Sequence, residues 1–111
     1  MTSNINPSSE NITSELRRGV ISIAVLSQLV EAQYGYSLLK HLTELGLEID
    51  QGTLYPLLRR LESQGLLESD WRIEDERPRL YYILSAQGKR ALSNLTKEWK
   101  NLVDVLDEML Q

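Results

Sequence analysis

The stretch "GTLYPLLRRLESQGLL" at residues 52–67 decides the fold of this chain. Its leucines follow the i, i+3, i+4, i+7 spacing of one buried helix face. They are Leu54, Leu57, Leu58 and Leu61. Asp50 is placed as an N-cap and Gly65 as a C-terminal cap. The pattern therefore predicts a short helix with its leucines toward a core.

The side of this helix opposite the leucines carries residue types that suit contact with DNA. Gly52 and Thr53 would present backbone N–H groups where the helix dipole favours a phosphate. Tyr55 offers a hydroxyl or a ring, and Arg59 offers donors for phosphate or guanine. Pro56 gives up one backbone donor and leaves a turn with few side-chain atoms, which permits close approach. The alternative is an ordinary solvated face with an exposed tyrosine and arginine.

Two further helices are predicted before this stretch. The first runs from about Ser14 to Val30 and is apolar on two sides, so it needs two packing partners. One side comprises Leu16, Val20, Ile23, Ala24 and Val30, and the other comprises Ile21, Val25 and Leu29. A shorter helix is predicted at 35–45, with Gly46 as its cap. Its shared apolar face comprises Leu38, Leu39, Leu42 and Leu45.

Two strands are predicted after the stretch, at 67–73 and 80–84, on either side of the charged turn "EDERP". We expect a hairpin with a flexible tip and with Pro78 at its exit. Three helices followed by a hairpin indicate a mainly α (α+β) fold, a winged helix-turn-helix. Between residues 66 and 84 five acidic residues outnumber three arginines, so the predicted wing is net acidic.

Ser85 is placed to cap a final helix that reaches nearly to Gln111. Its apolar residues are spaced alternately by three and four, the seam of a heptad repeat. A helix of about 25 residues is roughly 37 Å long and overhangs a domain whose radius of gyration is about 13 Å. The uncovered seam predicts a two-fold dimer, and the alternative is a helix folded back over its own core.

The predicted dimer interface combines the second side of the first helix with the seam of the last. Its residues are Ile21, Val25, Leu29, Leu92, Leu95, Trp99, Leu102, Leu106 and Met109. Such a dimer would hold two recognition helices about 34 Å apart, or a multiple of that distance. Trp99 either packs within this interface or forms one wall of a pocket for a flat aromatic ligand.

Composition excludes several classes of function. The chain has 111 residues, no cysteine and one histidine, His41, so disulfides, thiol catalysis and a metal site are not expected. No nucleophile–base set can be assembled, so neither an enzyme nor a cofactor is expected. No signal peptide or membrane span is present, which predicts a soluble cytoplasmic protein. The net charge of −4 favours an alternative, a winged-helix module that docks a protein instead of DNA.

Four segments together resemble the PadR family of bacterial transcriptional regulators. They are "YGYSLLKHL", "GTLYPLLRRLESQGLLESDW", "RPRLYYILSAQGKRAL" and "KEWKNL". The likeness covers about residues 15–110, and the single C-terminal helix is similar to that of the small subfamily. The resemblance implies a winged helix-turn-helix dimer that represses transcription from palindromic operators. It also implies sensing of phenolic or multidrug-like compounds.

The resemblance implies site residues as well. The DNA-contacting positions of the family fall at Tyr36, Gln51, Thr53, Tyr55, Pro56 and Arg59, and in the wing at Arg77, Arg79 and Tyr82. Gly52 joins them from its place at the helix start. A tryptophan that lines a ligand pore in some small members matches Trp99. Many relatives have a glycine-rich, basic wing tip, whereas "IEDERPRL" is acidic and has Leu80 where a basic residue is common. Weaker wing contacts are therefore expected.

The expected organisation has three parts: a disordered tail at 1–12, a winged helix-turn-helix DNA-binding domain at 13–85, and a dimerisation helix at 86–111. The expected partners are double-stranded operator DNA, a second copy of the chain and a small aromatic effector, with no membrane.

Overall fold

The helix α3 (Gln51–Ser63) lies at the centre of the structure, a computed structural model that describes residues 7–111, with side chains from residue 11 onward. All of its predicted core leucines are buried. Asp50 Oδ1 accepts a hydrogen bond from the Thr53 N–H at 2.8 Å, which confirms the predicted N-cap. Gly65 has a φ of +83°, so its left-handed backbone ends the helix as predicted.

The helix α1 (Pro7–Gln28) is longer than predicted. It begins at Pro7 rather than at about Ser14, so only residues 1–6 of the predicted tail remain, and these lie outside the described residues. Val25 and Leu29 have no exposed surface, and Ile21 is 6% exposed. Their assignment to a dimer interface is therefore wrong. They pack in the core of their own chain, because the leucines of α3 need an apolar surface to cover them.

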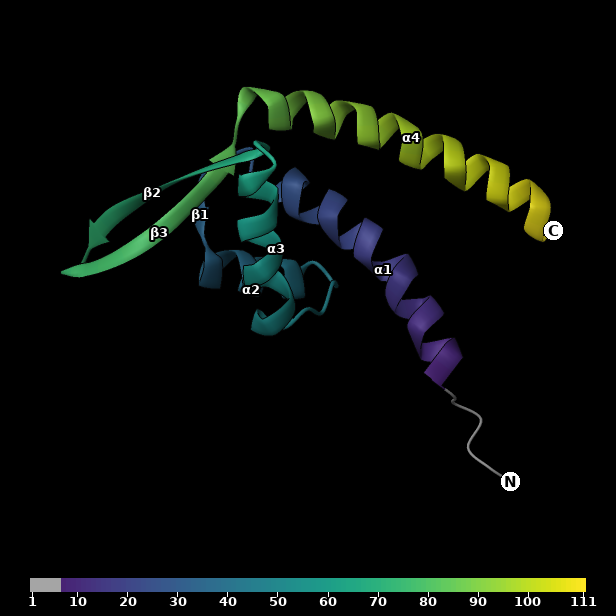
Figure 1. The fold of residues 1–111 in the computed structure, drawn as a ribbon, viewed down its shortest axis with the longest axis horizontal. Helices are drawn as coiled ribbons and strands as arrows, with labels where there is room; N and C mark the ends of the chain where they lie inside the picture. The colour runs from purple at the N-terminus through teal and green to yellow at the C-terminus, as the bar shows by residue number, and fades with distance from the viewer. Residues whose placement is uncertain (1–6) are drawn as a thin grey trace.

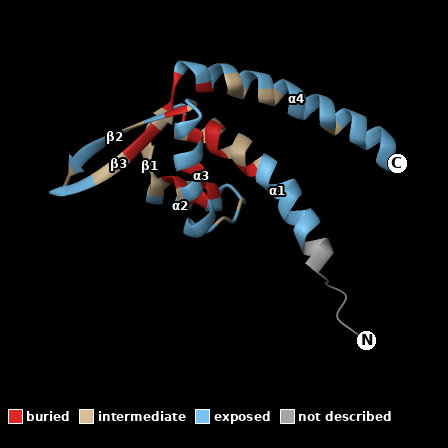
Figure 2. Cartoon of the chain, viewed as in Figure 1, coloured by how far each residue is buried: buried red, intermediate tan, exposed pale blue. Residues whose placement is uncertain are grey.

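The helix α2 (Gly35–Glu44) contributes Leu38 and Leu42 to the same core. Leu45, predicted on this face, is exposed, since it lies beyond the last helical turn. Gly46 has a φ of +105°, which confirms that glycine ends this helix. Figure 2 shows the buried residues gathered where α1, α2, α3 and the sheet meet.

The sheet has three antiparallel strands in the order β1 (Gln33–Tyr34), β3 (Arg77–Leu84), β2 (Leu67–Glu74). The hairpin is longer and its turn shorter than predicted. Only Asp75 and Glu76 connect the strands, both with positive φ (51° and 63°). Pro78 lies within β3, opposite Ile73. This position tolerates proline because β1 pairs only with Tyr81 and Tyr82 and leaves that edge of β3 open.

The helix α4 (Ala86–Leu110) starts at the predicted cap, where Ser85 Oγ accepts from the Gly88 N–H at 2.9 Å. Figure 1 shows α1 and α4 diverging as two arms that run away from the sheet. The radius of gyration is 16.5 Å, above the value of about 13 Å for a compact domain of this size, and Figure 1 shows α4 extending beyond the winged domain, as predicted. Leu92 and Leu95, at the root of α4, are half-buried against the core of their own chain, and their place in a dimer interface stays a prediction.

Three helices followed by a β-hairpin confirm the predicted winged helix-turn-helix, with β2 and β3 as the wing. Among residues 7–111, no helix is both long enough and apolar enough to cross a lipid bilayer.

Candidate nucleic-acid interface

A pocket of about 280 Å³ lies where α3 meets the wing and the start of α2. We call it the tyrosine pocket. Its lining residues are Tyr34, Gly35, Tyr36, Tyr55, Leu58, Arg59, Arg79, Leu80 and Tyr82. Five of the ten residues that the sequence assigned to DNA binding are among them, namely Tyr36, Tyr55, Arg59, Arg79 and Tyr82. The fold therefore brings residues from three separate parts of the chain to one surface.

Close packing between α2 and α3 positions Tyr55. A Cβ atom placed on Gly35 would lie 2.7 Å from Cε1 of the Tyr55 ring, closer than real Cβ contacts allow. Gly35 therefore leaves the space that the ring occupies. Tyr55 is half-buried and packs against the core with part of its ring. It is a fixed wall of the pocket rather than a free surface side chain.

The first turns of α3 present the other predicted contacts outside the pocket. Gln51, Gly52, Thr53 and Pro56 are all exposed. The backbone N–H of Thr53, however, already donates to Asp50 Oδ1, so the predicted phosphate contact at this group is wrong. The exposed side chain of Thr53 remains available, since the cap occupies only its backbone donor.

Tyr82 does not have the exposure that a DNA contact requires. It is 6% exposed and belongs to the core cluster. Burial raises the pKa of its hydroxyl above the usual range, with the Glu62 carboxylate adding to the rise and Arg59 opposing it. Its inclusion among the DNA contacts is corrected to a role as the floor of the tyrosine pocket.

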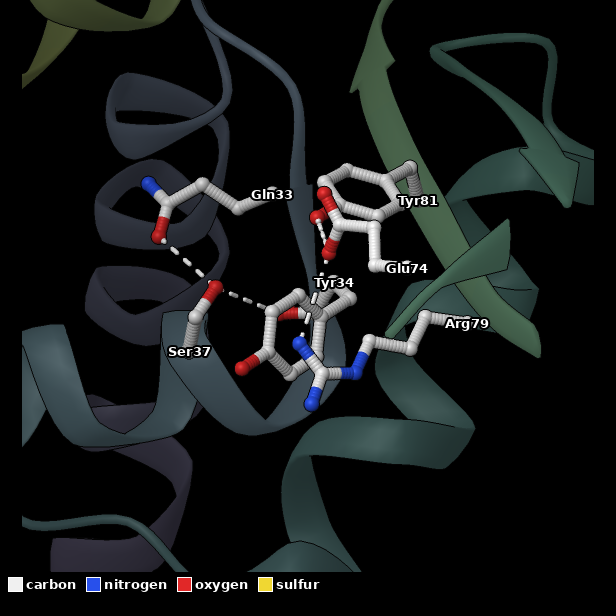
Figure 3. Close-up of polar contacts among 6 residues, drawn as sticks. All are labelled: Gln33, Tyr34, Ser37, Glu74, Arg79 and Tyr81. Atoms are coloured by element: carbon white, nitrogen blue, oxygen red, sulfur yellow. Dashed lines mark hydrogen bonds and ion pairs between the residues drawn. The ribbon is translucent and has the colours of Figure 1, made fainter. Parts of the chain in front are cut away.

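The wing side of the pocket is held by a polar network (Figure 3). Glu74 Oε1 accepts hydrogen bonds from the Tyr81 hydroxyl at 2.5 Å and from Arg79 Nη1 at 3.3 Å. The guanidinium carbon of Arg79 lies 4.4 Å from the centroid of the Tyr34 ring. Ser37 Oγ donates to the Tyr34 carbonyl at 3.0 Å, which ties β1 to α2. The pKa of Tyr81 is raised, chiefly because its hydroxyl donates to the Glu74 carboxylate.

The sequence analysis missed several residues of this network. It had no signal for β1, because a strand of two residues has no periodicity, and so it missed Tyr34. Glu74 was grouped with the acids of the wing tip, although its side chain folds back toward Tyr81.

Arg77, a predicted wing contact, is exposed near the turn, and within residues 11–111 neither of the two ion pairs of the structure involves it.

This surface has an exposed helix N-terminal half, a pocket with two arginines and an adjoining wing. Together with the element order, it defines a winged helix-turn-helix protein of the nucleic-acid-binding kind. Residues 23–94 match the model of the transcriptional regulator PadR-like family. The chain belongs to this family, as the sequence resemblance indicated.

Relatives support the assignment over nearly the full chain. The transcriptional regulator Rv3488 of Mycobacterium tuberculosis is 33% identical over 97 residues, covering 86% of this chain and 88% of that protein. A crystal structure of a PadR family transcriptional regulator from Eggerthella lenta has 45% identity and a TM-score of 0.84, covering 93% of this chain and 92% of the other. A PadR-like transcription factor from Bacteroides fragilis has 33% identity and a TM-score of 0.77, covering 89% and 98%.

We expect Gly35→Ala to lower the free energy of unfolding by about 1–3 kcal/mol, because the new methyl group overlaps the Tyr55 ring. In a Tyr55→Ala background the same change should be neutral or stabilising, since alanine is the better helix former. Urea unfolding of the four proteins of this double-mutant cycle measures the coupling. Equal losses in both backgrounds would show that Gly35 does not seat Tyr55.

Proposed function

We propose that this chain binds double-stranded operator DNA through the first turns of α3 and the mouth of the tyrosine pocket. The observation that carries the proposal is the meeting of Arg59, Tyr55 and Tyr36 beside the exposed start of α3. The guanidinium of arginine and the hydroxyl of tyrosine both donate hydrogen bonds to phosphate, and the start of a recognition helix is the part that enters the major groove. The net charge of −4 is compatible with this, because a DNA footprint depends on local charge.

We propose further that two copies join through the arms formed by α1 and α4. Large apolar side chains are exposed along both arms and away from the predicted DNA surface. They are Ile12 and Leu16 on α1 and Trp99, Leu102, Val105, Leu106, Met109 and Leu110 on α4. Contiguous apolar surface of this kind marks an association site. A two-fold dimer presents two copies of α3, which suits a palindromic operator and repression by occupying promoter DNA.

Arg59→Ala should weaken operator binding by about 1–3 kcal/mol if the guanidinium contacts a base. If it contacts phosphate instead, the slope of log affinity against log salt concentration should become shallower by about one unit, because one fewer counterion is released. Fluorescence anisotropy with DNA from the upstream region of the gene, measured between low and high salt, separates these outcomes.

Arg60→Ala is the matched control for this measurement. Arg60 is the next residue of α3, exposed and of the same charge, but it does not line the tyrosine pocket. We expect little change in specific affinity from this variant. Equal losses from both variants would mean that only the net charge of α3 matters, and absence of any specific complex for the wild type would favour the protein-docking module.

Leu106→Glu tests the dimer. It places a charge on the exposed seam of α4, far from the winged domain, so the fold of each chain should survive. Sedimentation should show a monomer where the wild type is a dimer, and operator affinity should fall by about tenfold or more, because the second half-site is lost. Lys100→Glu, on the same helix and outside the seam, is the control. A dimer that persists in Leu106→Glu would contradict the assigned interface.

We also propose an effector site on the arms. An apolar pocket of about 330 Å³ lies between α1 and α4, with Trp99 in its wall. Its other lining residues are Leu16, Gly19, Val20, Ser22, Ile23, Leu95, Glu98 and Leu102. This volume suits a small flat aromatic molecule, and a molecule bound between the arms would change the angle at which a dimer holds its two copies of α3.

Tryptophan fluorescence tests this site. In a Trp71→Phe background Trp99 is the only tryptophan, and titration with flat cationic dyes or hydroxycinnamates should quench its emission with saturation. Saturation should also reduce operator affinity. An unchanged signal at millimolar ligand would reject the effector pocket and leave the DNA-binding proposal intact.

A further inference from the structure

The arginines of the wing do not all face solvent freely. Arg72 and Arg79 lie directly opposite each other on β2 and β3, so two like charges share one rung of the hairpin. Such a pair is destabilising unless other charges compensate it. Asp70 supplies one compensation, with its Oδ2 atom 3.3 Å from Nε of Arg72. Glu74 supplies the other, with its Oε1 atom 3.3 Å from Nη1 of Arg79.

Glu74 does more than neutralise a charge. Its Oε1 atom also accepts the hydroxyl hydrogen of Tyr81, whose ring lies edge-on to Tyr34 with centroids 5.5 Å apart. Arg79 in turn stacks on Tyr34. Glu74 therefore fixes the guanidinium between a carboxylate and an aromatic ring, and the ring belongs to β1, outside the hairpin (Figure 3).

The position of Arg79 matters because it lines the tyrosine pocket together with Arg59. The side chain of Arg79 is 28% exposed, so it is held at the pocket rather than extended into solvent. An arginine already ordered in this way loses less side-chain entropy when it binds an anion.

We propose that Glu74 is a positioning residue for DNA binding, which holds Arg79 against Tyr34 so that Arg79 and Arg59 converge on the same stretch of the DNA backbone. The inference rests on the proposed function and deepens it. It gives the Glu74 carboxylate a favourable effect on DNA affinity, whereas charge alone would make every acidic residue near the turn weaken DNA binding. The two readings predict opposite effects of removing this carboxylate.

Glu74→Ala and Glu76→Ala make the decisive comparison. Glu76 is an exposed turn residue, and within residues 11–111 no side-chain hydrogen bond or ion pair of the structure includes it. Both changes remove one negative charge from the same end of the wing. Glu76→Ala should tighten operator binding by about two- to fivefold, as expected for an exposed charge. Glu74→Ala should instead weaken it by about two- to tenfold, because Arg79 is no longer ordered.

Two further variants show whether Glu74 acts through Arg79. In an Arg79→Ala background, Glu74→Ala should no longer weaken binding and should behave like Glu76→Ala. Glu74→Gln keeps an acceptor oxygen and should restore part of the wild-type affinity. The salt dependence of operator binding adds a readout that a loss of stability would not change. If Arg79 leaves its phosphate, Glu74→Ala should reduce the slope of log affinity against log salt concentration by about one unit.

The free protein gives a readout without DNA. The ring carbon resonances of Tyr81, followed by NMR as the pH is raised, should show its pKa falling toward the usual value in Glu74→Ala and unchanged in Glu76→Ala. If the wild type binds operator and both alanine variants tighten binding equally, the positioning role is overturned while the proposed function stands. If the wild type binds no DNA, both fail together.

Discussion

The leucine face of α3 packs against α1, α2 and the base of the sheet, and this contact orients every part of the interface. Each buried leucine contributes about 1.5–3 kcal/mol, so the face as a whole outweighs the cost of about 3 kcal/mol for a proline within a helix. This explains how Pro56 is tolerated inside α3. Once the leucines point inward, Arg59 and the exposed residues of the first turn, Gln51, Gly52 and Thr53, point outward. The same core uses Val25 and Leu29 of α1, so the opposite side of α1 is left outside the core.

Sequence patterns predicted the elements that depend on repeated burial or on a single well-defined cap. The leucine spacing of α3, the caps at Asp50 and Ser85, and the overhang of α4 all follow from local signals. Patterns did not predict which apolar side of α1 faces the core, because Ile21 and Ile23 are equally apolar and only the tertiary packing distinguishes them. They also missed β1, whose pairing depends on Tyr81 and Tyr82, far along the chain.

The candidate site shows the same division. Arg59 was accessible to sequence reasoning because its type and its place on α3 suit DNA, whereas Tyr36 came only from the resemblance to the family. Tyr82 was misassigned. Alternation along a strand beside a core predicts that one of two neighbouring tyrosines is buried more deeply than the other, but in β3 both Tyr81 and Tyr82 are covered. Glu74 was read as one acid among several. Its folding back onto Tyr81 and Arg79 is a property of the hairpin register, which composition does not contain. Charge totals therefore describe the wing less well than its pairings do.

The tight turn at Asp75 and Glu76 fixes the length of the hairpin. Each strand has eight residues, from Leu67 to Glu74 and from Arg77 to Leu84, so its length is about 26 Å. A two-residue connection with both φ angles positive has no slack to lengthen it. A one-residue slip would turn every outward side chain to the opposite face. Evolution can therefore lengthen this wing only by adding matched residues to both strands, or by accepting a bulge.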